Sequence, residues 1–311
     1  MPRRPLQRVQ SALAARRYFI GQQTKSQIAS ALGISRFKVA RLIDAAIEQK
    51  IVQFLIKEPD DLNAELGEAV RNKYGLNAVL VLDGPDMSTS DLMIPLGNLA
   101  ASLLDETLED GQALGISWGR TLAAMTRALE HLPKVDVIQV AGIPGGLEIS
   151  QNPLELVRRL TNLSGGKAYP IYGPMWTEDP TLAQRLRQEP AVAAAMAKYV
   201  DIDVLVVGIG SWNPAESCLC SGFPEDWRRE ALDAGVVADV CGSLIGSDGR
   251  EIPSRLDKQG LTITSEQLDR IPEIIGVGGG LEKADAIAAV LRGRWVDVLV
   301  TDACVARRLL A

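Results

Sequence analysis

The first fifty residues carry apolar positions at helical spacing. Leu6, Val9, Leu13 and Ala14 recur every three or four residues and lead to Gly21, which suits a helix end. A short second helix is predicted over 25–32. A third helix is predicted over 35–50, with a buried stripe made of Val39, Leu42, Ile43, Ala46 and Ile47.

The residues around the second helix fit two helices that cross closely. Thr24 and Ser35 are good N-caps, because their hydroxyls can accept hydrogen bonds from first-turn amides. Gly33 can adopt the positive φ of a tight turn. Ala29 is small at the expected crossing, and an apolar Val39 follows Gly33 by six residues. This spacing predicts a helix-turn-helix; a plain helical hairpin with a solvated basic face is the alternative.

Beyond residue 58 the pattern changes to alternating strands and helices. Short apolar runs, mostly β-branched and flanked by glycine, predict buried parallel strands over 78–82, 113–116, 135–140, 204–209, 236–240, 274–277 and 298–301. Helices are predicted over 60–74, 95–108, 120–131, 153–163, 180–199 and 282–291. The alternation indicates a Rossmann-like, doubly wound α/β domain with its ligand at the carboxyl ends of the strands. The β-branched segment 51–58 predicts a wing or linking strand.

Charge divides the chain at the same place. The 311 residues have a formal net charge of −6, but residues 1–58 hold 11 Lys+Arg against 3 Asp+Glu, a net of +8. Residues 59–311 hold 22 against 36, a net of −14. The charge division therefore indicates two domains, over 1–58 and 59–311, of which only the first meets a polyanion. Together with the helix-turn-helix spacing, the positive charge makes residues 1–58 the expected DNA-binding domain.

The outward face of the third helix is the expected DNA contact. Its start enters the major groove in helix-turn-helix proteins. Arg36 or Arg41 could read guanine edges, and Lys38, Lys25 and Ser26 could anchor phosphates. The predicted DNA-binding set is Lys25, Ser26, Ser35, Arg36, Phe37, Lys38 and Arg41.

Glycine-rich turns follow several predicted strands, at 115–121, 141–146, 208–213 and 276–283. None is a P-loop, but backbone amides at such turns can hold an anion. Arg120 and Lys283 lie at helix starts, where a cation opposes the helix dipole unless an anion is near. We expect a small anionic ligand there. Asp239 could accept hydrogen bonds from ligand hydroxyls or, equally, cap a turn.

Several function classes are disfavoured. Cys218 and Cys220 form a CxC with no matching pair, so we expect neither a zinc site nor a disulfide scaffold. No apolar run approaches 18 residues, so we expect no membrane span. An enzyme needs a poised base, yet the single histidine, His131, lies at a helix end and no nucleophile motif is near the loops. We expect no enzyme activity and no cofactor.

The chain resembles SorC/DeoR-type bacterial transcriptional regulators over nearly its whole length. We call residues 1–58 the head and residues 59–311 the body. The head motif reads YFIGQQTKSQIASALGISRFKVARLI (18–43). The body motifs are GISWGRTL (115–122), DVIQVAGIPGG (136–146), VGIGSW (207–212), VADVCG (237–242) and IGVGGGLEKADAIAAVLRGRWVDVLVTDACVARRLL (275–310). Lys25 departs from the usual Gln, Lys50 from the usual Gly, and AGIPGG from the commoner N-G-G turn.

The resemblance implies a winged helix-turn-helix over 1–58 joined to a sugar-binding effector and oligomerisation domain over 59–311. The second domain would have the fold of sugar-phosphate isomerases, deaminases such as glucosamine-6-phosphate deaminase, and CoA transferases. It implies a homotetramer that binds double-stranded operator DNA and responds to a phosphorylated sugar or related metabolite. Matching its pocket motifs residue by residue gives Ser117, Gly119, Arg120, Thr121, Gly142, Gly210, Asp239 and Lys283.

The expected function is regulation of a sugar or polyol catabolic operon, with operator affinity modulated by a carbohydrate effector. The expected location is the bacterial cytoplasm, at the nucleoid when DNA-bound. The alternative is a sugar-phosphate isomerase- or deaminase-like enzyme with an accessory DNA-binding head. Turnover of sugar phosphates would distinguish the two.

Overall fold

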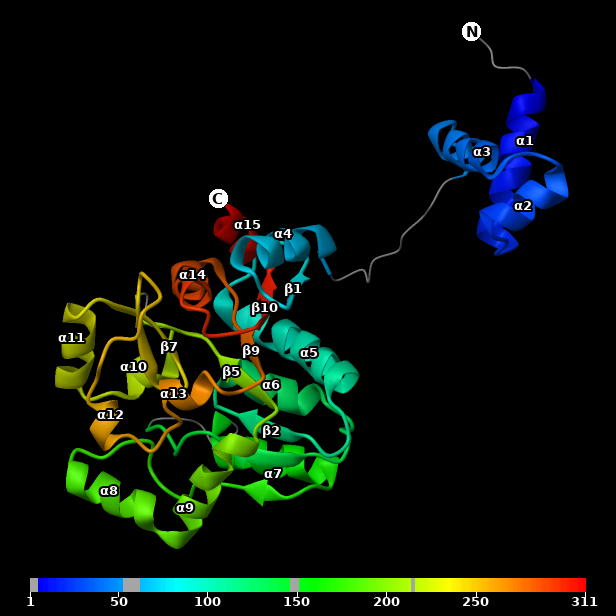
Figure 1. The fold of residues 1–311 in the computed structure, drawn as a ribbon. Coiled ribbons are helices and arrows are strands. Elements are labelled where there is room, and N and C mark those ends of the chain that lie inside the picture. The colour runs from blue at the N-terminus through cyan, green and yellow to red at the C-terminus, as the bar shows by residue number, and fades with distance from the viewer. Residues whose placement is uncertain (1–4, 53–61, 146–150, 214–215) are drawn as a thin grey trace. The chain divides into compact units, whose positions relative to one another are not determined.

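The computed structural model describes residues 5–52, 62–145, 151–213 and 216–311. The chain separates into two compact units, Met1–Lys57 and Glu58–Ala311, so the division lies one residue from the predicted boundary. Figure 1 shows both units, and each is described by itself.

Over residues 5–52, the N-terminal unit consists of three α-helices around a small core. Helix α1 (Pro5–Ala15) continues into a π-helical turn, η1 (Arg16–Ile20), and is followed by α2 (Lys25–Leu32) and α3 (Arg36–Glu48). Helix α2 has the predicted bounds. Of the predicted stripe on α3, four residues are buried, but Ile47 is 42% exposed, so the packed stripe ends at Ala46. Apart from Ile51 and Val52, which lie in a bend, the predicted wing at 51–58 lies outside the described residues.

A parallel sheet of seven strands forms the centre of the C-terminal unit, in the order β1-β10-β9-β5-β2-β3-β4. The strands are β1 (Ala78–Leu82), β2 (Ala113–Ile116), β3 (Asp136–Gln139), β4 (Ala168–Tyr169), β5 (Val204–Gly208), β9 (Glu273–Val277) and β10 (Val298–Asp302). The chain builds outward from β2 through β3 and β4, then returns to β5 on the other side of β2. The β2/β5 junction is therefore the switch point where doubly wound folds bind ligands.

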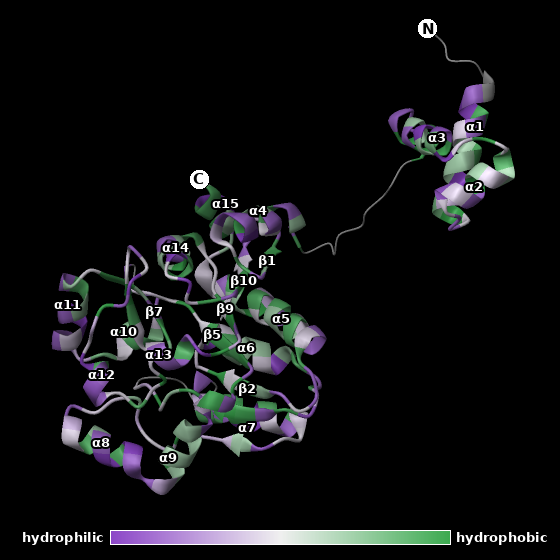
Figure 2. Ribbon diagram, in the orientation of Figure 1, coloured by the Kyte–Doolittle hydropathy of each residue, from purple (hydrophilic) through white to green (hydrophobic). Residues whose placement is uncertain are grey.

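Helices cover both faces of this sheet, as a strand buried on both sides requires. Along β5, Val204 and Val206 belong to the core under α5, α6 and α7, whereas Leu205 and Val207 belong to the core under α4, α14 and α15. These helices are α4 (Ala64–Tyr74), α5 (Thr89–Thr107), α6 (Arg120–Ala128), α7 (Pro153–Ser164), α14 (Ala284–Arg292) and α15 (Ala303–Leu310). Helices such as α11 (Glu225–Asp233) carry both hydrophobic and hydrophilic colours in Figure 2 because one face is buried.

The prediction of a parallel strand over 236–240 was wrong in its pairing. β7 (Val236–Val240) lies in a separate antiparallel sheet between β6 (Gly210–Ser211) and β8 (Ser243–Gly246). The β7–β8 turn consists of Cys241 and Gly242, both at positive φ, 52° and 98°. Such a turn joins adjacent antiparallel strands.

Two helix predictions also differ from the structure. Helix α5 begins at Thr89, six residues before the predicted start, because Ser88 caps it and Pro95 lies inside it. The predicted helix over 180–199 divides at Pro190 into α8 (Pro180–Gln188), α9 (Pro190–Met196) and a 3₁₀ turn, η3 (Ala197–Asp201), since proline interrupts the helical hydrogen bonds. The remaining short elements are α10 (Cys218–Gly222), α12 (Leu256–Gln259), α13 (Ser265–Leu268) and η4 (Leu281–Lys283).

Candidate effector pocket and DNA-contact helix

An open pocket lies at the carboxyl ends of β2, β5 and β9. Seven of the eight predicted effector residues line it: Ser117, Gly119, Arg120, Thr121, Gly210, Asp239 and Lys283. Its other lining residues are Thr89, Met93, Trp118, Leu122, Gly208, Ile209, Glu216, Ser217, Cys218, Cys241 and Val277. The switch point of the sheet therefore gathers side chains from five separate segments of the chain.

Gly142 is the predicted effector residue that does not line this pocket. Its backbone N–H donates to Leu261 O at 2.7 Å. A Cβ atom at this position would lie 2.4 Å from Pro174 O, so glycine is needed for close backbone packing. At Gly142 the glycine is therefore explained by backbone packing.

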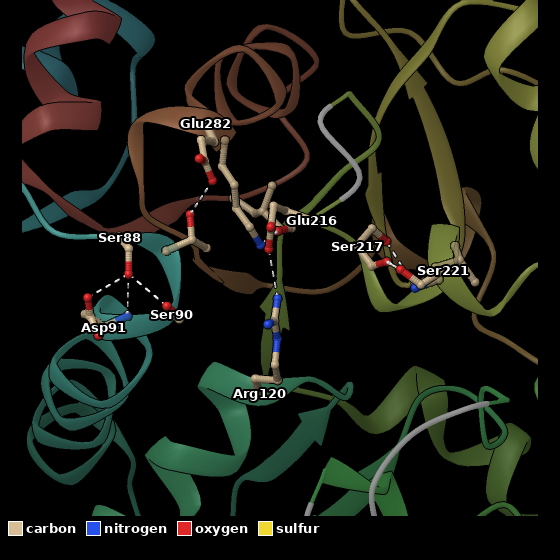
Figure 3. A network of polar contacts seen from close by, with 12 residues as sticks. Ser88, Ser90, Asp91, Arg120, Glu216, Ser217, Ser221 and Glu282 are labelled. Carbon is tan, nitrogen blue, oxygen red and sulfur yellow. Dashed lines mark hydrogen bonds and ion pairs between the residues drawn. The ribbon is translucent and has the colours of Figure 1, made fainter.

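The first loop presents a cation at the start of α6. Gly119 has φ 131° and precedes the helix, and Arg120 is its first residue. The Arg120 guanidinium donates from Nη2 to Glu216 Oε2 at 3.0 Å, and the two side chains are 38% and 31% exposed. Figure 3 shows Arg120 directed from the start of α6 toward Glu216. The predicted anion-binding cation therefore already has a carboxylate partner.

Asp239 is a buried carboxylate on β7. Its Oδ1 accepts from Trp212 Nε1 at 2.8 Å and from Ser217 Oγ at 2.5 Å. Burial raises the pKa of Asp239, while those two hydrogen bonds and nearby Lys283 oppose the rise. The described residues place no hydrogen-bond donor on Oδ2, so this oxygen can accept from a ligand hydroxyl. Both donors to Asp239 among the described residues are side chains, so the carboxylate does not cap a turn through a backbone amide; ligand contact stays a prediction.

Lys283 lies at the junction of η4 and α14, opposite the β5 loop. Its Nζ donates to Ile209 O at 3.0 Å. Burial lowers the pKa of Lys283, and the neighbouring Asp239 carboxylate opposes that effect. The amine therefore faces the pocket beside a carboxylate, in a place where an anionic ligand would favour its charged form.

Several other residues line the pocket without having been predicted from the sequence. Thr89 and Met93 reach the pocket from the first turns of α5, and Ser88-x-x-Asp91 was a capping signal for that earlier start. Figure 3 shows Ser88 with Ser90 and Asp91 at this helix start. Ser217 accepts from the amides of Leu219 and Cys220 as the N-cap of α10. Glu216 carried no comparable signal.

The tryptophans near the loops have different positions. Trp118 lines the pocket, and Trp212 donates a hydrogen bond from Nε1 to Asp239 Oδ1. Trp176 packs edge-to-face on Phe223, with 5.2 Å between the ring centroids. His131 is absent from the pocket lining and pairs with Asp105 at 2.9 Å. Among the described residues no cluster of His, Cys, Asp or Glu fits a metal ion, and no helix is long and apolar enough to cross a membrane.

The predicted DNA-contact residues lie on and beside α3. Ser35 caps this helix by accepting from Lys38 N at 3.2 Å. Phe37 is 79% exposed, and Arg36, Lys38 and Arg41 are exposed as well. Ser26 is exposed on α2, whereas Lys25 stacks over the Tyr18 ring at 5.6 Å. The start of α3 thus presents three cations and one aromatic ring away from the core.

Comparison with known proteins gives one family. The family model described as "Putative sugar-binding domain" matches residues 60–311. The chain is 28% identical over 298 residues to the transcriptional regulator LsrR of Enterobacter sp. (strain 638), covering 94% of this chain and 90% of that protein. It is 27% identical over 310 residues to the sorbitol operon regulator of Klebsiella pneumoniae, covering 95% and 96%.

Solved structures show the same fold. The full-length sorbitol operon regulator SorC from Klebsiella pneumoniae matches with a TM-score of 0.75 at 24% identity, over 98% of this chain and 99% of that one. The predicted α/β fold and the predicted resemblance are confirmed. The chain belongs to the sugar-binding-domain family of SorC/DeoR-type transcriptional regulators.

Proposed function

We propose that this protein is a DNA-binding transcriptional regulator of a sugar or polyol catabolic operon, whose operator affinity is changed by a phosphorylated carbohydrate. The observation that carries the proposal is the pocket at the β2/β5 switch point, which combines a buried carboxylate, Asp239, with two cations, Arg120 and Lys283. Carboxylates recognise sugar hydroxyls, and cations at glycine-rich helix starts recognise phosphate.

The chemistry of the pocket divides between its two kinds of group. Asp239 Oδ2 accepts hydrogen bonds from the hydroxyls of the carbohydrate, and the hydroxyls of Ser117 and Thr121 accept or donate. Arg120 and Lys283 compensate the charge of a phosphate, and the backbone N–H groups at the start of α6 add donors. The relatives named as operon regulators support a carbohydrate as the ligand class.

The N-terminal unit supplies the DNA contact in this proposal. Arg36 and Arg41 read base edges, Lys38 and Ser26 contact phosphates, and Phe37 contacts a thymine methyl in the major groove. The two functions are joined by linkage: an effector that binds one quaternary arrangement better shifts a homotetramer between DNA-competent and DNA-incompetent forms. The proposed setting is the bacterial cytoplasm.

This role needs no catalysis, and the pocket supports that reading. The histidine of the chain lies outside the lining, and Glu216 is paired with Arg120. The remaining lining carboxylate, Asp239, is assigned here to the ligand hydroxyls through Oδ2, while its Oδ1 accepts from Trp212 and Ser217. An isomerase or deaminase would need a free base positioned for proton transfer.

The test uses the full-length chain. A thermal-shift screen of sugars, polyols and their phosphates identifies stabilising compounds, and DNA selected from a random pool by the protein serves as operator in fluorescence anisotropy. We expect a sugar phosphate to stabilise the C-terminal unit and change operator affinity at least fivefold. Lys283→Ala should weaken that compound's binding more than tenfold. Turnover of the compound, or operator affinity insensitive to every stabilising compound, would contradict the proposal.

A further inference from the structure

The formal charges of the side chains that line the pocket sum to zero. Its lining contains two cations, Arg120 and Lys283, and two carboxylates, Glu216 and Asp239. Arg120 is paired with Glu216, whereas Lys283 Nζ donates to Ile209 O and forms no ion pair among the described residues. A phosphate held by both cations would therefore meet the Glu216 carboxylate at Arg120 and have the Asp239 carboxylate as a neighbour, and uncompensated negative charge is costly in a partly buried site. For a phosphate to contact both cations, either Glu216 leaves Arg120 or Asp239 moves away from the site.

Asp239 is poorly suited to leave. It is 4% exposed, and its Oδ1 is held by Trp212 and Ser217. Moving Asp239 would leave Trp212 Nε1 and Ser217 Oγ without an acceptor. Because Asp239 pairs with Gly210 between β7 and β6, a backbone shift there would also disturb that sheet.

Glu216 is well suited to leave. Its side chain is 31% exposed, and Arg120 is the partner found for it among the described residues. The next residue, Ser217, is fixed independently, because its Oγ donates to Asp239 and accepts from two amides of α10. A rotation of the Glu216 side chain alone would therefore free Arg120 without unwinding α10. Figure 3 shows this separation, with Glu216 directed to Arg120 and Ser217 directed away.

We propose that Glu216 is a competing carboxylate that occupies the anion position at Arg120 until the phosphate of the ligand replaces it. Glu216 then sets the specificity of the pocket, because only a ligand with an anionic group can displace it. A neutral sugar leaves the Arg120–Glu216 ion pair intact, so the Glu216 side chain still occupies the anion position. This inference rests on the proposed function and adds to it the residue that selects phosphorylated over unphosphorylated ligands.

A second carboxylate provides a matched control. Glu282 follows the glycine-rich 276–281 turn and accepts from Thr89 Oγ1 at 3.2 Å, and Thr89 lines the pocket. Glu282 therefore lies near the same site, and within the described part of the chain it forms no ion pair. Glu282→Gln removes the same charge as Glu216→Gln and leaves the Arg120–Glu216 pair in place.

The experiment measures the dissociation constant of inorganic phosphate by calorimetry, with the full-length protein and its variants. We expect E216Q to bind phosphate about three- to tenfold more tightly than wild type, since a partly exposed ion pair no longer competes. E282Q should gain less than twofold. In an R120Q background, adding E216Q should produce no more gain than adding E282Q. Glucose 6-phosphate and glucose serve as second probes, and E216Q should favour only the former.

Equal gains for E216Q and E282Q would overturn the inference, because they would indicate a general charge effect. A gain from E216Q that persists in R120Q would overturn it as well, as would phosphate binding to neither wild type nor E216Q. Thermal denaturation of each variant verifies folding. The operator assay tests the proposed function separately. If a sugar phosphate changes operator affinity but E216Q and E282Q bind phosphate alike, the proposed function stands and this inference is refuted.

Discussion

Asp239 is the residue on which the pocket's polar contacts converge. Asp239→Ala would leave Trp212 Nε1 and Ser217 Oγ without an acceptor and remove the carboxylate beside Lys283. We expect a loss of about 2–4 kcal/mol in the free energy of unfolding. Asp239→Asn retains an acceptor and should lose less than half as much. All five tryptophans lie in residues 118–295, so their fluorescence reports unfolding of the C-terminal unit.

The control for this prediction is Asp248→Ala. Asp248 is exposed and accepts from the backbone of Arg250, so its removal should change stability by less than about 0.5 kcal/mol. Similar losses for both alanine variants would show that the buried hydrogen bonds of Asp239 contribute no special stability.

Lys283 gives phosphate binding a pH dependence. Burial lowers its pKa below the ordinary value of 10.5, whereas a bound phosphate would raise it. Between those two pKa values binding takes up a proton, so affinity should fall as pH rises through this window. We expect weaker phosphate binding at about pH 10 than at about pH 8, where phosphate itself stays dianionic. Calorimetry over this range tests the prediction; a slope that persists in Lys283→Gln would refute it.

At the scale of elements, the turn between α2 and α3 depends on Gly33. It has φ +63° and donates its N–H to Ala29 O and Ser30 O, which ends α2. Gly33→Ala forces a Cβ into the left-handed region and should destabilise the N-terminal unit by about 1 kcal/mol. Hydrogen exchange of peptides from α2 and α3 in the full chain measures this loss. Ser30→Ala, at an exposed helical position, should change exchange little; equal effects would contradict the role of the turn.

The elements differ in how far local sequence determined them. Helix α2 was predicted residue for residue because Thr24 caps it with Gln27 and Gly33 ends it, all within ten residues. Helix α5 was mispredicted because Pro95 resembles a helix start, yet the packing of Leu92 and Leu96 retains it inside the helix. β7 was assigned to the wrong sheet because Cys241 replaces the Asn or Asp typical of its turn.

Local sequence also determines the pocket only in part. Glycine-rich turns after strands mark Ser117, Arg120 and Gly210, because parallel strands bring their carboxyl ends to one edge of the sheet. Gly142 has the same local signal, but tertiary packing against Pro174 explains it. Glu216 reaches Arg120 from 96 positions away, a contact that only the folded chain specifies.

At the scale of the whole molecule, the charge division predicts the salt dependence of DNA binding. Residues 1–58, with a net charge of +8, should release counterions when their cations bind DNA phosphates. The body, with a net charge of −14, should not contact the DNA. Lys38→Gln should reduce the slope of log affinity against log salt by about 1 for each bound head and weaken binding across sequences. Lys134→Gln in the body is the matched control. An equal change of slope for both variants would mean that the body also contacts DNA.

Linkage joins the two units thermodynamically, whatever path the coupling takes. If a sugar phosphate changes operator affinity by some factor, saturating operator must change sugar-phosphate affinity by the same factor. We expect calorimetric affinities measured with and without operator duplex to differ by the ratio that anisotropy gives for operator, about 5- to 100-fold. E216Q should tighten sugar-phosphate binding in both states by similar factors, because Glu216 competes at Arg120 within the pocket. Unequal ratios would indicate a third state, such as a ligand-dependent change of oligomer; a pure two-form mechanism would then be wrong.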